Sequence, residues 1–292
     1  MDQQPARQLI NPAKLSLIGF LILCCLSLIA QAEITQAEVT RAEITRAKIT
    51  QANISQVENN QAANLVATQF VLVPNHNSTY LIEKYGTNVG EMHNALNYEK
   101  AVINYTATAT AKGVARFFVN AQPKETSMLN WPVNNPGTAP QLQSYVYFIE
   151  KKHKKNQQIR LSYNDKNVAQ IEGHYKNKAY TVESAQPVWS RQFLPLLMSS
   201  DLQQNPNIRQ NSFSVINKGL IQKYTYTLEA KETLQYQNKP LPVLKFKITK
   251  KGSHRMSYAW LSRAHYYLPL KIEQYKNGDL NGRMLMTHLK LN

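Results

Sequence analysis

From about residue 70 onward, apolar and polar side chains alternate along the chain with a period of two. Between residues 243 and 250, Leu244, Phe246 and Ile248 fall on one face, and lysine and threonine fall on the other. This alternation is typical of a strand with one buried and one solvated face. Repeated along the chain, it predicts an antiparallel sheet that is covered on one side only.

Glycine, proline and asparagine separate the alternating segments and predict hairpin turns between them. We expect segment 114–121 to pair with segment 102–109 across Lys112-Gly113. Segment 123–143 contains four prolines and predicts a long loop. The predicted strands are 80–85, 89–96, 102–109, 114–121, 145–150, 157–163, 168–172, 179–182, 220–230, 243–250, 256–261, 267–275 and 284–291.

One segment, 190–203, departs from the alternation. Phe193, Leu196, Leu197 and Leu202 recur there near helical spacing, and Pro195 suits the first turn of a helix. We therefore expect a single helix lying against the sheet. The predicted fold is mainly β: a curved antiparallel sheet, or half-barrel, with one packed helix around an apolar interior.

The first 32 residues have the features of an export signal. A polar start with Arg7 and Lys14 precedes an uncharged apolar run, 15–30, and Ala30-Gln31-Ala32 follows. A basic flank, a short apolar run and small residues at the end are typical of a cleaved signal peptide. We predict cleavage near Ala32 and a periplasmic protein with no stable transmembrane span. The alternative is a retained anchor, but about 20 apolar residues are needed to cross a bilayer.

Residues 33–65 form a second unusual segment. Segment 32–56 repeats every five residues and is weakly similar to pentapeptide repeats. Five such repeats make little more than one coil of a solenoid, which has no neighbouring coil to stack on. We expect 33–65 to be a flexible tether, with an ordered element as the alternative, and 66–292 to be a single β half-barrel domain.

The amino-acid composition narrows the classes of binding partner to expect. Basic residues outnumber acidic residues 34 to 18, for a net charge of +16. Such charge favours anionic partners, including phospholipid headgroups and acidic polymers of an envelope compartment. Solubility alone is the alternative explanation, and export argues against nucleic acid. The two cysteines, Cys24 and Cys25, lie inside the signal, so we expect neither thiolate chemistry nor a cysteine-ligated metal in the mature chain.

Candidate chemistry is sparse. No catalytic or cofactor-binding motif is present, and the seven histidines are scattered without metal-ligand spacing. We therefore expect a protein without catalytic residues, metal or cofactor. Two groups of residues are candidates for ligand binding. The first is aromatic and either lines a hydrophobic mouth or belongs to the core. The second is a basic run that either contacts lipid headgroups or forms a solvated hairpin tip. The two groups are Trp189, Trp260 and Tyr267, and Lys151, Lys152, Lys154 and Lys155.

Three pieces of sequence together resemble a known family. They are LIEKYGTNVG at 81–90, the helical segment 194–202, and Trp260-Leu261-Ser262 followed by YLPLKIEQ at 267–274. In this order they are similar to the bacterial exported family called domain of unknown function 3108, over roughly residues 70–292. The resemblance implies a β half-barrel like those of periplasmic lipoprotein carriers, and an export compartment. It implies no established activity.

The favoured hypothesis is a non-catalytic carrier module for an amphiphilic or anionic envelope component. The curved sheet would hold an acyl chain or apolar peptide, and basic residues at the rim would engage an anionic head. One alternative is an envelope scaffold that binds a protein partner through the tether and an exposed sheet edge. A second alternative is a hydrolase that acts on envelope polymers, which has no motif to support it.

Overall fold

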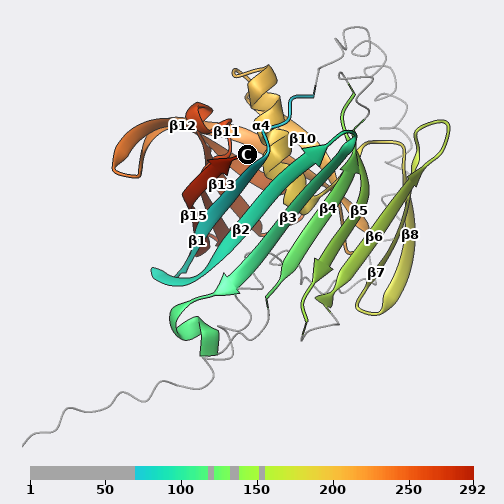
Figure 1. The fold of residues 1–292 in the computed structure, drawn as a ribbon, viewed down its shortest axis with the longest axis horizontal. Helices are drawn as coiled ribbons and strands as arrows, with labels where there is room; N and C mark the ends of the chain where they lie inside the picture. The colour runs from blue at the N-terminus through green and yellow to red at the C-terminus, as the bar shows by residue number, and fades with distance from the viewer. Residues whose placement is uncertain (1–69, 118–121, 132–137, 151–154) are drawn as a thin grey trace, which may run out of the picture.

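The computed structural model describes residues 70–117, 122–131, 138–150 and 155–292. The predicted signal peptide, its cleavage site and the tether lie outside these residues. The described residues form one 15-stranded sheet with a single α-helix (Figure 1). The strands are β1 His76–Lys84, β2 Thr87–Glu99, β3 Val102–Ala111, β4 Lys124–Asn130, β5 Gln141–Phe148, β6 Gln157–Tyr163, β7 Ala169–Tyr175, β8 Lys178–Ser184, β9 Val188–Ser190, β10 Gln210–Asn217, β11 Leu220–Tyr236, β12 Lys239–Lys250, β13 Arg255–Leu261, β14 Pro269–Lys276 and β15 Asp279–Leu291.

The sheet is antiparallel except at one end. Its order is β8-β7-β6-β5-β4-β3-β2-β1-β15-β14-β13-β12-β11-β10-β9, so β1 pairs with both β2 and β15. The short strand β9 pairs with β10 in parallel. The sheet curls into a nearly closed barrel. This confirms the predicted mainly β fold with a curved sheet and one helix.

Alternation along the strands separates the two faces as predicted. In β6 and β7 buried and exposed positions alternate strictly, and Ile159, Leu161 and Ile171 point into the core. Burial of such aliphatic side chains stabilises the fold by about 1.5–3 kcal/mol each. The inner face of the sheet is therefore the core of the protein.

Helix α4, Leu194–Gln204, lies inside the curl, between the strands β1–β5 and the strands β10–β13 (Figure 1). A short 3₁₀ turn, η4 at Arg191–Phe193, leads into it from β9. Pro195 occupies its first turn, as predicted, and the Asn205 backbone N–H caps it by donating to the Asp201 carbonyl at 2.8 Å. Seven of its residues are buried, which fits a helix enclosed on most sides. In the described residues no helix has the length and apolar character needed to cross a membrane.

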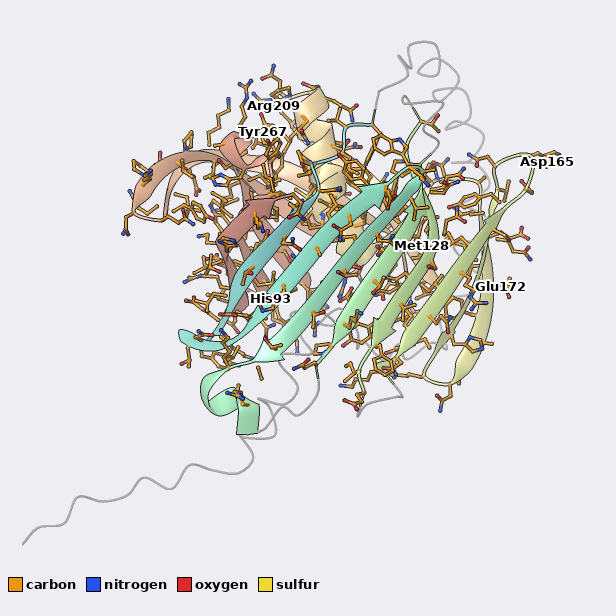
Figure 2. All side chains as sticks on the ribbon, in the orientation of Figure 1. His93, Met128, Asp165, Glu172, Arg209 and Tyr267 are labelled. Atoms are coloured by element: carbon orange, nitrogen blue, oxygen red, sulfur yellow. The ribbon has the colours of Figure 1, made fainter. Side chains whose placement is uncertain are left out.

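Two predictions about the β3 region are wrong. Strand β3 pairs with β2 on one side and β4 on the other, not with segment 114–121, and residues 113–117 form a 3₁₀ turn, η2. Strand β4 lies within the stretch that was predicted to be a loop. Its inward residues include Glu125 and Ser127, and its outward residues include Met128, which is 39% exposed (Figure 2). The apolar–polar alternation of β4 is thus partly inverted, which conceals the strand in the sequence.

Other elements differ from the prediction in detail. Strands β9 and β10 were not predicted. Asn277 and Gly278, both with positive φ, form the tight turn between β14 and β15, whereas Asn281-Gly282 lies inside β15. Positive φ favours asparagine and glycine, so only the first of the two Asn-Gly pairs acts as a turn.

The sheet has two edges, β8 and β9, and we call the region where they meet the seam. Strand β9 contacts β5 from inside the curl, and the Tyr180 side chain of β8 packs over two glycines. A Cβ atom at Gly173 would lie 2.5 Å from the Tyr180 ring, and one at Gly219 would lie 3.0 Å from it. The absence of side chains at these two positions makes room for the ring that closes the seam.

Candidate functional site

A cavity of about 160 Å³ lies between helix α4 and the inner face of the sheet. This volume holds roughly ten water-sized spheres, at about 15 Å³ each. Residues of β1–β4 line one side, and residues of β11–β15 line the other. Its apolar lining is made of Tyr80, Met92, Tyr105, Ala107, Leu194, Pro195, Met198, Ile248, Ala259, Leu261, Leu268, Pro269, Ile272 and Met284.

A buried ion pair marks the polar end of this cavity. Glu125 of β4 and Arg191 of η4 both line the cavity, and their side chains approach to 3.3 Å. The Tyr145 hydroxyl donates to the second Glu125 oxygen at 2.8 Å. Burial raises the pKa of Glu125 although Arg191 opposes the shift. Burial lowers the pKa of Arg191, but the interactions with Glu125 and with three nearby tyrosines together outweigh burial and raise that pKa overall, so the guanidinium stays charged.

Neutral hydrogen bonds hold the same segment against the sheet. The Ser127 and Ser190 hydroxyls lie 2.7 Å apart, and Ser127 donates to Gln192 at 3.0 Å. The Gln192 amide donates to the Tyr105 carbonyl at 3.2 Å. These contacts fix η4, and with it Arg191, across the inner face of β3 and β4.

Two buried polar atoms that belong to cavity-lining residues have no hydrogen-bond partner among the described residues. They are Asn94 Oδ1 on β2 and the Tyr224 hydroxyl on β11. Both residues are more than nine-tenths buried. A buried polar atom without a partner costs about 1–3 kcal/mol, so these two positions have unused capacity to bind a polar group.

A second, smaller cavity of about 40 Å³ adjoins the first. Tyr224, Ile248, Ser257 and Gln274 line both cavities. The smaller one also contains basic side chains, which come from β12 and β13. They are Lys250 and Arg255.

We call four basic residues the cationic cluster: Arg191, Lys250 and Arg255, which line the cavities, and Lys218, which lines neither cavity but feels the charges of Arg191 and Arg255. Burial lowers the pKa of Lys218 to about 8, helped by the charges of Arg191 and other nearby cations. Burial also lowers the pKa of Lys250, with contributions from Arg255 and Arg191. The cluster therefore concentrates positive charge at the polar end of the cavity.

The structure separates the three aromatic residues that the sequence proposed for a hydrophobic mouth. All three are 4–6% exposed, and none lines either cavity. Trp189 of β9 stacks on Phe193, with ring centroids 5.8 Å apart. Trp260 lies on the outer face of β13, beneath the Lys271 ammonium at 3.6 Å from its ring. Tyr267 lies beside helix α4 and packs in a core cluster with Met198 (Figure 2).

The basic run is described only in part. Lys151, Lys152 and Lys154 lie outside the described residues. Lys155 is half-buried, and its charge contributes to the lowered pKa of Lys218. The end of this run therefore lies on the same side of the molecule as the cationic cluster. Its role in ligand binding remains a prediction.

Sequence reasoning missed the residues that form the polar end. Tyr224 and Lys250 belong to predicted strands, but nothing in the alternation distinguishes them from other tyrosines and lysines. Arg191 begins the short turn η4, Lys218 lies in the turn between β10 and β11, and the curl of the sheet brings them together. In the parts of the chain described, no group of three or more histidine, cysteine, aspartate or glutamate residues is placed to hold a metal.

Comparisons with known proteins give a structural likeness only. No protein-family model matches the chain, and no curated protein matches it. The resemblance to domain of unknown function 3108 is therefore not confirmed and stays a prediction.

Three solved structures illustrate the likeness. A beta-barrel-like protein of domain of unknown function DUF1849 from Brucella abortus has a TM-score of 0.48 and 10% identity, over 76% of this chain and 99% of that one. A protein with a YmcC-like fold from Bacteroides fragilis, described as exported, has a TM-score of 0.30 and 10% identity, over 76% and 99%. The hypothetical lipoprotein YmcC from Escherichia coli K12 has a TM-score of 0.26 and 11% identity, over 79% and 95%. At these scores, function does not transfer from any of the three.

Proposed function

We propose that this protein is a non-catalytic periplasmic carrier that holds the apolar part of one amphiphilic molecule in the larger cavity. The observation that supports this most directly is the cavity itself. It has an apolar lining and a polar end where Asn94 Oδ1 and the Tyr224 hydroxyl have no hydrogen-bond partner in the described part of the chain. An apolar chain fits the first part, and a polar head fits the second. Each buried methylene contributes about 0.8 kcal/mol, so about six would contribute roughly 5 kcal/mol.

The ionisable groups that line the cavity fit binding better than catalysis. Glu125 accepts from both Arg191 and Tyr145, so its oxygens are already occupied. His76 Nδ1 lies 2.9 Å from the Pro74 carbonyl, and burial lowers the pKa of the imidazole. A neutral, anchored histidine and a paired carboxylate are poorly arranged for proton transfer. The carrier hypothesis thus explains these groups as parts of the cavity wall.

Native mass spectrometry of the mature protein, purified from cells without detergent, tests the proposal. We expect an adduct with the mass of one amphiphile, which organic extraction removes. A fluorescent fatty-acid analogue should then bind to the extracted protein. Failure of both measurements on protein with a native circular dichroism spectrum would overturn the carrier function.

Variants that fill the cavity localise the binding. Ala259 and Ala107 line the cavity and are 2% exposed, whereas Ala179 on β8 is exposed. Ala259→Leu and Ala107→Leu should each weaken binding of the analogue at least tenfold, and Ala179→Leu should leave it unchanged. Two cavity variants are used because added volume in a core also destabilises folding. Unchanged affinity in folded forms of both would place the ligand elsewhere.

One observation favours the scaffold hypothesis as a second candidate. Among the described residues, β8 pairs only with β7, so its other backbone edge is available to a partner strand. A photocrosslinker at the exposed Lys178 should then capture one dominant envelope protein. Such capture, with no bound amphiphile, would favour the scaffold over the carrier. The hydrolase hypothesis stays a prediction without a proposed site.

A further inference from the structure

We infer that the headgroup of the bound molecule is an oxyanion, a carboxylate or a phosphate, and that it lies beside Tyr224 where the two cavities meet. This inference rests on the proposed function, since it places the apolar part of the same molecule in the larger cavity. Tyr224 and Lys250 are the residues that carry it, with Arg255 and Arg191 nearby.

The first argument is the Tyr224 hydroxyl. It is buried, Tyr224 lines both cavities, and the hydroxyl has no hydrogen-bond partner among the described residues. Burial raises the pKa of Tyr224, although the charge of Arg191 lowers it in part. The hydroxyl therefore keeps its proton at neutral pH and is able to donate a hydrogen bond. An oxyanion accepts such a bond and satisfies the group.

The second argument is the sign of the local charge. Lys250 donates to the neutral side chain of Gln222 at 3.3 Å, and the charges that lower its pKa, those of Arg255 and Arg191, are both positive. Arg191 is largely offset by Glu125 at 3.3 Å. No aspartate or glutamate is among the described residues that line the smaller cavity, and a negative headgroup would relieve the repulsion between its cations.

The third argument is the type of donor. A tyrosine hydroxyl, an ammonium and guanidinium groups are all donors, and they suit the several acceptor oxygens of a carboxylate or phosphate. A cationic headgroup would be repelled by Lys250 and by Arg255. A neutral headgroup would satisfy Tyr224 but would not relieve the repulsion between Lys250 and its cationic neighbours. The arrangement therefore selects for an anion.

Isothermal titration calorimetry with four probes tests this inference on the extracted mature protein: dodecanoate, dodecyl phosphate, dodecanol and inorganic phosphate. The wild type should bind dodecanoate or dodecyl phosphate at least roughly tenfold more tightly than dodecanol, as expected for charge-assisted hydrogen bonds. Lys250→Met and Tyr224→Phe should each remove most of this preference while dodecanol binding persists. Lys290→Met, a change at an exposed lysine of β15, should have no effect.

The outcomes separate the headgroup from the carrier function. Equal affinity for dodecanol and both anionic probes overturns the oxyanion site but leaves the carrier. Binding of inorganic phosphate alone, lost in Lys250→Met, supports the oxyanion site and shows that its anion is free phosphate, which overturns the carrier. If no probe binds, both proposals fail. Tyr224→Phe removes only one oxygen atom, so it tests the site even where Lys250→Met does not fold.

Discussion

The sheet closes differently on its two sides. At the junction of β1 and β15, a backbone ladder joins His76–Glu83 to Arg283–Leu291, strands that lie about 200 positions apart in the chain. At the seam, β8 and β9 are close in sequence but do not pair with each other. Side chains close the seam instead: Tyr180 over its two glycines, and the Glu125–Arg191 pair beneath β9.

The difference between junction and seam bears on function. A backbone ladder forms with almost any side chains, provided that one face is apolar. Closure by side chains, as at the seam, requires specific residues at the contact positions. It also leaves space between the strands that it joins. The larger cavity and the cationic cluster both include Arg191, which directly follows β9 at the seam. The seam is thus the part of the barrel in which a ligand site is compatible with the fold.

The largest effect is expected from Glu125→Ala, which leaves the Arg191 guanidinium buried without its carboxylate. Removing one partner of a buried ion pair costs about 3–5 kcal/mol. Urea unfolding followed by tryptophan fluorescence should show this loss. The double variant Glu125→Leu, Arg191→Met should recover most of it, because no unpaired charge remains. A single variant as stable as the wild type would show that the pair does not hold the seam.

A comparable but slightly smaller effect is expected at the junction. Ile82 is fully buried on β1, opposite Met284 of β15. Ile82→Ala should cost about 2–5 kcal/mol through lost burial and a cavity. Because the junction belongs to the cooperative ladder, hydrogen exchange should accelerate in strands on both sides of the sheet. Acceleration confined to β1 would contradict this view of the junction.

Tyr180→Ala should weaken the seam locally. The ring packs on Gly173 and Gly219, and its hydroxyl accepts from Gln157 at 3.3 Å. We expect a loss of about 1–3 kcal/mol and faster hydrogen exchange in β8, with little change in β1 and β15. Tyr85→Ala, at the exposed tyrosine of the β1–β2 turn, is the control. Uniform acceleration across all strands would remove the distinction between seam and junction.

The smallest effect is a change with pH at Lys218. Its pKa is lowered from an ordinary 10.5 to about 8 by burial and by the charges of Arg191, Lys176, Arg255 and Lys155. The folded state thus binds fewer protons than the unfolded state between these values, and stability rises with pH from about 8 to 10.5. Lys218→Met should be more stable than the wild type at pH 7, and the difference should shrink toward pH 10.5. A constant difference would contradict the lowered pKa.

The sequence predicts the parts of the fold that follow from burial alone. Strands such as β6 and β7 bury aliphatic residues at alternate positions, and α4 carries leucines at helical spacing, so both patterns are visible. Strand β4 is not predicted, because its inward residues Glu125 and Ser127 have polar partners on η4, Arg191 and Gln192. Those partners come from about 65 positions further along the chain, and sequence periodicity contains no information on them.

The candidate site is less predictable than the fold for a related reason. The sequence shows an excess of lysine and arginine, but its densest basic run, 151–155, contains none of the four residues of the cationic cluster. Arg191, Lys218, Lys250 and Arg255 come from four separate elements or turns. Only the curl of the sheet brings them together, so neither spacing nor composition identifies them.

The β1–β15 pairing also affects the order in which the strands are connected along the chain. The Asn292 backbone N–H donates to the Asn75 carbonyl at 2.9 Å, so the start of β1 and the end of β15 lie side by side. Only Ala185-Gln186-Pro187 connects β8 to β9. A circular permutant that begins at β9 and ends at β8 would form every antiparallel pair between successive strands. Its contact order would be lower, and a lower contact order is associated with faster folding.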